Sequence, residues 1–183
     1  MFAVKEKHTI KDYKLLSENA PYQLIEGEFV MTPAPSPFHQ IISANLFKAI
    51  AKFVDVNSAG IALYSPLDVY LGDENALQPD IVFISKQRQE IIKDDGIHGA
   101  PDMVIEILSP STAYYDIRKK YRIYEQSRVK EYWIVDPDMK SAELYSLSEQ
   151  CKLLLNSGQT EQRKIRSGIL SGFEITFEEV FLV

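Results

Sequence analysis

The stretch DMVIEILSPSTAYYDIRKKYRIYEQSRVKEYWIVD, residues 102–136, has the pattern of a strand, a helix and a second strand. The first apolar run ends at Ser109-Pro110, and Ser111 or Thr112 is suited to cap the helix that follows. Pro137 stops the second apolar run. Two strands joined through a helix usually lie parallel with a right-handed crossover, so this stretch predicts a βαβ unit in the centre of the fold.

Further elements are predicted on both sides of this unit. They are a hairpin within 22–31 that turns at Gly27, a helix over 37–56 capped by Ser36, strands within 60–73 and 78–85, a polar connector over 86–100, a meander within 141–157, and a strand with a last helical turn within 168–183. Short strands interleaved with helices predict one α/β (α+β) domain over residues 1–183, with a mixed central β-sheet flanked by helices.

The composition is that of an ordinary globular domain. The chain has 183 residues, of which 45% are hydrophobic and 25% charged, and its net charge is −6. This balance argues against a broad basic surface that coats nucleic acid, although it allows a local site rich in carboxylates. The single cysteine, the absence of a long apolar run and the polar N-terminus together predict a cytoplasmic protein.

Two carboxylates occur where the sequence predicts buried strands. By alternation, Glu106 shares one face of its strand with Val104 and Leu108, and Asp80 directly precedes the apolar run IVFI. A buried carboxylate costs several kcal/mol unless it is paired or binds a metal. Two such groups on adjacent strands can hold Mg²⁺ or Mn²⁺ near a phosphate. The alternative is that each lies at the rim of the sheet or pairs with an arginine.

A metal site that acts on phosphodiesters also needs a cation near the attacking water. Leu108 occupies the position where the simplest arrangement would place that lysine. The next candidate is Lys120, which shares one helix face with Asp116 and Tyr124 at spacings of four residues. The alternative is that Asp116 and Lys120 form an ordinary surface pair worth a few tenths of a kcal/mol.

Two other residues have less certain roles. Pro101-Asp102 repeats the letters of Pro79-Asp80, but Asp102 opens its strand, which favours a structural role in capping the connector. His39 lies in the first turn of a predicted helix, where it can cap, pack or contact a phosphate or water. The sequence leaves the roles of His39, Asp102 and Asp116 open.

Five segments in order resemble the Uma-type restriction endonuclease family of the PD-(D/E)xK nuclease superfamily. They are YQLIEGEFVMTPAPSPFHQIISANL (22–46), QPDIVFIS (78–85), APDMVIEILSPST (100–112), DIRKKYRIY (116–124) and VKEYWIVDP (129–137). Single motifs of this kind are weak, but their order is specific. The resemblance implies a restriction-endonuclease-like core, a Mg²⁺ or Mn²⁺ cofactor and DNA as the substrate.

The resemblance also implies roles for individual residues. Asp80 and Glu106 match the metal ligands, Lys120 matches a catalytic lysine moved to the helix, and Glu28 matches an early acid that supports the metal or the water. Leu108 departs from the superfamily, which has lysine there. Arg128 departs from relatives that have glycine, so the helix must either end in a left-handed residue at some cost or end differently.

Three functions are compatible with these observations. The first is a metal-dependent endonuclease that hydrolyses phosphodiester bonds of DNA, predicted to act as a homodimer because the strands after Val129 are strongly apolar. The second is a non-catalytic nucleic-acid-binding or accessory module that retains the nuclease fold, suggested by Leu108 and the acidic surface. The third is a phosphohydrolase that acts on a small molecule or nucleotide through the same metal site.

Overall fold

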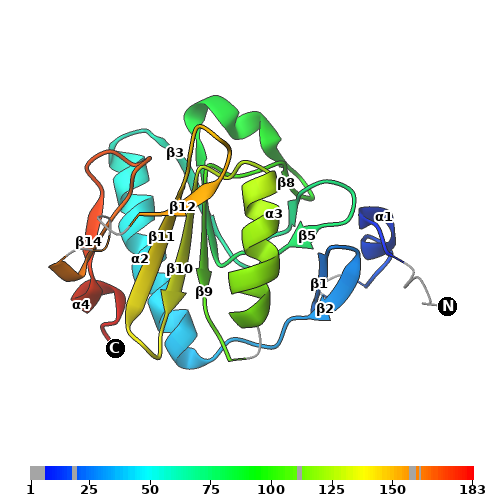
Figure 1. Ribbon diagram of the computed structural model, residues 1–183, viewed down its shortest axis with the longest axis horizontal. Coiled ribbons are helices and arrows are strands. Elements are labelled where there is room, and N and C mark those ends of the chain that lie inside the picture. Colours follow the sequence, from blue (N-terminus) through cyan, green and yellow to red (C-terminus); the bar gives the residue numbers. More distant parts are fainter. Residues whose placement is uncertain (1–6, 18–19, 111–112, 157–159, 161) are drawn as a thin grey trace.

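The computed structural model describes residues 7–17, 20–110, 113–156, 160 and 162–183 (Figure 1). The predicted caps Ser111 and Thr112 lie outside these ranges. The helices are α1 (Ile10–Tyr13), α2 (Pro37–Val56), the 3₁₀ helix η1 (Lys86–Ile91), the π-helix η2 (Tyr115–Lys120), α3 (Tyr121–Gln126) and α4 (Phe177–Val180). Within the described ranges, no helix is both long and apolar enough to cross a bilayer.

The strands of the described residues form two larger sheets and one hairpin. The main sheet has the order β12 (Leu153–Leu155), β11 (Ser141–Leu147), β10 (Glu131–Asp136), β9 (Met103–Ile107), β6 (Ile81–Ser85) and β3 (Gly60–Tyr64). The second sheet has the order β2 (Glu28–Met31), β1 (Tyr22–Ile25), β5 (Ala76–Leu77), β4 (Val69–Tyr70), β8 (Gly96–His98) and β7 (Ile92–Lys93). The hairpin joins β13 (Lys164–Arg166) to β14 (Glu174–Thr176).

The centre of the main sheet is the predicted parallel pair. β9 and β10 run parallel, with Glu106 opposite Ile134. β6 adds to the other edge of β9 in the antiparallel direction, with Ile81 opposite Ile105. The mixed α/β fold and the parallel central strands are therefore confirmed.

Each face of the main sheet is covered by a different helix (Figure 1). On one face, Ile105 and Trp133 pack in a core with α2. On the other, Val104 and Tyr132 pack in a core with α3. Alternation places Glu106 on the α3 face, where it is only 3% exposed. The sheet therefore directs this carboxylate toward the helix that carries the predicted lysine.

The second sheet contains strands that the sequence did not predict. The connector over 86–100 was expected to be irregular, but it contains η1, β7 and β8. β8 pairs with β4, with Val69 opposite Ile97. Strands of two or three residues are too short to produce a recognisable alternation, so only their partners in space define them. The predicted hairpin of β1 and β2 is confirmed, and it turns at Glu26 and Gly27, which both have positive φ.

The helix after β9 differs from the simple α-helix that was expected. The segment η2 is a π-helix, and the turns of α3 that follow it are α-helical. A π-helical turn is rare and is frequent at functional sites. Spacings of four residues occur in both kinds of helix, so the sequence pattern could not distinguish them. Asp116 and Lys120 still lie on one side of this segment, with Asp116 Oδ1 2.9 Å from Lys120 Nζ.

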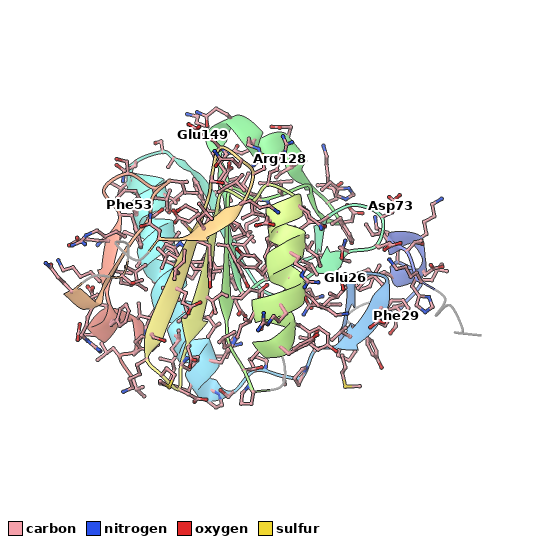
Figure 2. The ribbon with its side chains drawn as sticks, in the orientation of Figure 1. Glu26, Phe29, Phe53, Asp73, Arg128 and Glu149 are labelled. Atoms are coloured by element: carbon pink, nitrogen blue, oxygen red, sulfur yellow. The ribbon has the colours of Figure 1, made fainter. Side chains whose placement is uncertain are left out.

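The last turn of α3 ends in a left-handed residue. Arg128 has a φ of 63°, and its exposed side chain, which is labelled in Figure 2, lies at the end of the helix. The amide of Val129 donates to the carbonyl of Tyr124 at 3.0 Å. This hydrogen bond closes the helix in the way that is usual when glycine is the left-handed residue at its end. Arg128 therefore adopts the conformation that favours glycine, in spite of its Cβ.

We expect Arg128→Gly to raise the free energy of unfolding by about 0.5–1 kcal/mol. Glycine removes the steric cost of the left-handed conformation, although it also makes the unfolded chain more flexible. Urea unfolding measures the change. The control is Arg122→Gly at an exposed position within α3, where glycine should destabilise by about 1 kcal/mol. A loss of stability in Arg128→Gly would contradict the expected strain.

The first strand after Val129, β10, does not supply the exposed apolar surface on which the homodimer prediction rested. β10 lies between β9 and β11, and Trp133 and Ile134 pack inside the two cores. These residues are therefore already covered within one chain. Leu154 and Leu155 on the edge strand β12 are more than half exposed. The homodimer itself stays a prediction.

Candidate active site

The site forms where β9 extends beyond its neighbour β6. The ladder between the two strands ends at Ile81 and Ile105, so the backbone of Ile107 has no strand partner on that side. The Asp80 carboxylate replaces the missing strand and accepts the Ile107 amide at 2.7 Å. The ring of His39 contacts the Ile107 carbonyl through Nε2 at 3.1 Å. Asp80 is thereby fixed to the end of β9.

His39 reaches this point from the start of α2. Ser36 caps the helix by accepting the His39 amide at 3.2 Å. The imidazole Nε2 lies 3.4 Å from Asp80 Oδ2. Burial opposes the imidazolium, but Asp80 and the Ile107 carbonyl favour it and raise the pKa of His39. The first turn of α2 therefore holds one wall of the site against the end of the sheet.

Glu106 is bound by two groups from the following helix. Lys120 Nζ donates to Glu106 Oε1 at 2.9 Å, and the Tyr124 hydroxyl donates to the same oxygen at 2.6 Å. Asp116 Oδ1 lies 2.9 Å from Lys120 Nζ, and both of these side chains are at most 3% exposed. Asp116 and Lys120 are thus a buried pair rather than a surface pair. The helix thus places the Lys120 ammonium beside Glu106, whereas the strand itself has Leu108 two residues further on.

The charges of this cluster do not balance. Asp80, Glu106 and Asp116 together carry two more negative charges than the Lys120 ammonium offsets when all are ionised. Burial raises the pKa of Glu106 to about 8; Lys120 opposes this shift, and Asp116 and Asp80 add to it. Burial opposes the charge of Lys120, but Glu106 and Asp116 outweigh it and raise the pKa of the lysine. Lys120 therefore stays an ammonium group and can donate hydrogen bonds but cannot act as a base.

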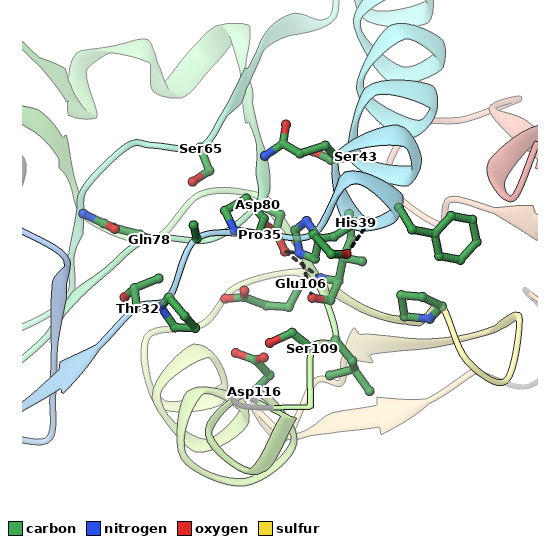
Figure 3. A pocket seen from close by; sticks show the side chains of 18 of the residues that line it. Thr32, Pro35, His39, Ser43, Ser65, Gln78, Asp80, Glu106, Ser109 and Asp116 are labelled. Carbon is green, nitrogen blue, oxygen red and sulfur yellow. Dashed lines mark hydrogen bonds and ion pairs between the residues drawn. The ribbon is translucent and has the colours of Figure 1, made fainter. Parts of the chain in front are cut away.

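The carboxylates open onto a cavity of about 380 Å³ (Figure 3). Figure 3 shows Asp80 and Glu106 near its centre and Asp116 on the side of the helix. The other lining residues include Pro33, Pro35, Leu108, Ser109, Pro110 and Pro137. Proline-rich loops and the end of the sheet therefore surround the acidic centre.

Glu28 lies outside this cavity. Its Oε2 is 3.7 Å from Nζ of Lys119, which also contacts Glu26 at 3.3 Å. These residues line a separate hollow together with Glu74. The structure thus brings Asp80, Glu106 and Lys120 together but does not place Glu28 in their cavity. The sequence could not indicate this, because the position of the β1–β2 hairpin depends on the pairing of β1 with β5 within the second sheet.

Asp102 lies at the opposite end of β9 and has a structural role, as expected. It accepts the Ser85 amide at 2.8 Å and lies 3.1 Å from Arg88 and 2.6 Å from Lys130. Burial opposes its charge, but these hydrogen bonds lower the pKa of Asp102 to about 2. The carboxylate joins the end of β6 to η1 and to the start of β10.

The donor set fits a magnesium or manganese ion that keeps part of its water shell. Among the described residues, no group of three or more His, Cys, Asp or Glu side chains is placed to hold a metal by itself. However, Asp80 Oδ1 and Glu106 Oε2 form no hydrogen bond with these residues, and the cluster has excess negative charge. Mg²⁺ is commonly bound through one or two carboxylates together with water and substrate phosphate.

Comparison with known proteins identifies the family. Residues 10–178 match the family described as "Uma2: Putative restriction endonuclease". The crystal structure of "a putative nuclease belonging to DUF820" from Anabaena variabilis ATCC 29413 has the same fold, with a TM-score of 0.77, 21% identity, and 94% of this chain and 97% of that chain covered. "Uncharacterized protein slr1290" from Synechocystis sp. (strain ATCC 27184 / PCC 6803 / Kazusa) is 23% identical over 148 residues, 80% of this chain and 77% of that protein. The chain belongs to the Uma2 family.

Proposed function

We propose that this chain is a metal-dependent endonuclease that hydrolyses phosphodiester bonds of DNA in the cavity around Asp80 and Glu106. The observation that carries the proposal is the convergence of three carboxylates and one buried ammonium group, with an unengaged oxygen on Asp80 and on Glu106. Membership of the Uma2 family supports the same reaction class.

The proposed roles follow from the contacts. Asp80 and Glu106 would hold Mg²⁺ or Mn²⁺, which supplies Lewis-acid polarisation of the phosphate and lowers the pKa of a bound water. Tyr124 and Lys120 orient Glu106 through one of its oxygens. Lys120 has three N–H groups, and its contacts with Glu106 and Asp116 use two of them. The third can donate to the attacking water or to a phosphate oxygen.

We expect the purified protein to nick supercoiled plasmid in Mg²⁺ or Mn²⁺, and Asp80→Asn to lower this rate by at least about 100-fold. The asparagine removes the charge that binds the metal, which is worth several kcal/mol in the transition state. Gel electrophoresis measures the nicking rate. The matched control is Glu28→Gln, which neutralises a carboxylate outside the cavity and should retain the rate. Equal losses in both variants would contradict the assignment.

Calorimetric titration separates the nuclease from the alternatives. A nuclease should bind Mn²⁺ at or below millimolar concentration, and Asp80→Asn should weaken this binding. No binding with or without DNA would favour the accessory module that retains the fold. Metal-dependent release of phosphate from nucleotides, without nicking of plasmid, would favour the phosphohydrolase.

A further inference from the structure

The cavity extends from the carboxylates along the first turns of α2. Gln40 and Ser43 line it from this helix, and Tyr64 and Ser65 line it from the end of the edge strand β3. Figure 3 shows Ser43 and Ser65 on one side of Asp80 and Glu106, and Asp116 on the other. The acidic centre therefore has a distinct neutral arm.

The arm can recognise a ligand only through uncharged groups. Among the described residues that line the cavity, Lys120 is the one lysine or arginine, and two carboxylates already engage it. Asp138 adds a further acid to the lining. Nucleic-acid surfaces that bind through phosphates are rich in lysine and arginine. Beyond the phosphate at the metal site, the cavity must therefore bind another part of the substrate.

The polar groups of the arm are available for a ligand. The side-chain amide of Gln40 and the hydroxyl of Ser43 form no hydrogen bond with the described residues, and Gln40 is exposed. By contrast, Gln78 donates to Asp68 at 2.9 Å, and Gln23 donates to Thr32 at 3.1 Å. The unused groups thus lie on α2, while the other two glutamines of the cavity hold the fold together.

Tyr64 supplies an aromatic surface beside these groups. Its ring lies against Phe47, with ring centroids 4.5 Å apart and the ring planes tilted by 58°, and the residue remains 59% exposed. An exposed aromatic ring that a neighbour holds in place is a surface on which a planar base can stack. A glutamine amide can form two hydrogen bonds with the edge of a base. The aromatic ring, the side-chain amide and the hydroxyl therefore line the same cavity as the carboxylates.

We propose that this arm is a subsite for one unpaired nucleobase, stacked on Tyr64 and bonded at its edge by Gln40 and Ser43. The inference rests on the proposed nuclease function and specifies its substrate as single-stranded DNA. In a duplex, the faces of a base are stacked on its neighbours and its pairing edge is hydrogen-bonded to the opposite base. A paired base therefore cannot enter this subsite. A volume of about 380 Å³ is near the lower end for small-ligand pockets and suits one nucleotide rather than a duplex.

Fluorescence anisotropy with labelled oligonucleotides in millimolar Ca²⁺ tests the subsite without measuring cleavage. Single-stranded DNA should bind more tightly than the matched duplex. Tyr64→Ala should weaken binding of the single strand by about 10- to 100-fold, the effect of losing one stacked base. Gln40→Ala should also weaken it. The control is Tyr114→Ala, because Tyr114 is similarly exposed at 65% but does not line the cavity.

An abasic site moved along the oligonucleotide provides a second measurement. At one position of the oligonucleotide, the abasic site should weaken binding to the wild-type protein. With that same oligonucleotide, Tyr64→Ala should cause no further loss of affinity. Equal affinity for duplex and single strand, or equal effects of Tyr64→Ala and Tyr114→Ala, would overturn the subsite even if the protein nicks DNA. Conversely, Tyr64-dependent binding of single strands by a protein that never nicks would retain the subsite and overturn the nuclease.

Discussion

Replacing Lys120 with Met is expected to lower the free energy of unfolding by about 3–5 kcal/mol, as for the loss of one partner of a buried ion pair. Lys120 is 3% exposed and lies 2.9 Å from both Glu106 and Asp116. Methionine fills a similar volume but leaves two buried carboxylates without their cation. Urea unfolding in the presence of EDTA measures the change.

Two further variants define the origin of this loss. Adding Glu106→Gln to Lys120→Met removes one of the two buried carboxylates that have lost their cation, and should recover part of the free energy of unfolding. Lys119→Met is the matched control, because Lys119 pairs with Glu26 and Glu28 near the surface, and its loss should cost at most about 1 kcal/mol. If Lys120→Met were as stable as Lys119→Met, the buried pair would not contribute to the fold. A loss of nicking in Lys120→Met therefore reports on chemistry only at a temperature where the variant is folded.

The second large effect is expected for Glu106→Gln, which should remove most of the pH dependence of stability between pH 5 and pH 9. In the metal-free protein, burial raises the pKa of Glu106 to about 8, above its ordinary value of 4.5. The folded state thus holds this proton more tightly than the unfolded state. The resulting stabilisation is complete below pH 4.5 and is lost as the pH rises through 8. The melting temperature of the wild-type protein should fall over this range.

Glutamine resembles the protonated carboxyl and does not titrate, so the melting temperature of Glu106→Gln should change much less over the same range. The variant should also lose nicking and the rise in melting temperature on adding Mn²⁺. Metal binding to the wild type should release a proton below pH 8 and tighten with rising pH. Glu28→Gln should keep both the pH dependence and the response to Mn²⁺. A Glu106→Gln variant with the wild-type pH slope would disprove the raised pKa.

Much of the fold could be predicted because its centre is coded by periodic apolar residues. The alternation in β9 placed Glu106 on one face, and the spacing of Asp116, Lys120 and Tyr124 placed them on one side of the next helix. Short connections bring these two elements together, so the ion pair could be expected from the chain alone.

Features that depend on distant contacts could not be predicted. His39 meets the Ile107 carbonyl because β9 extends beyond β6, which is a property of the strand register. Glu28 lies with Lys119 because the β1–β2 hairpin belongs to the second sheet. The very short strands β7 and β8 exist only through their partners. In each case the deciding partner is far away in the sequence or leaves no periodic pattern.

In the proposed nuclease, the position of the lysine on a helix would make activity conditional on complete folding. A nascent chain that has paired β6 with β9 already presents Asp80 and Glu106 together. It gains the Lys120 ammonium only when η2 and α3 dock on the sheet. A lysine at position 108 would instead arrive with the strand itself. If the chain is the proposed nuclease, this arrangement would therefore leave a partly folded chain without the Lys120 ammonium at its carboxylates.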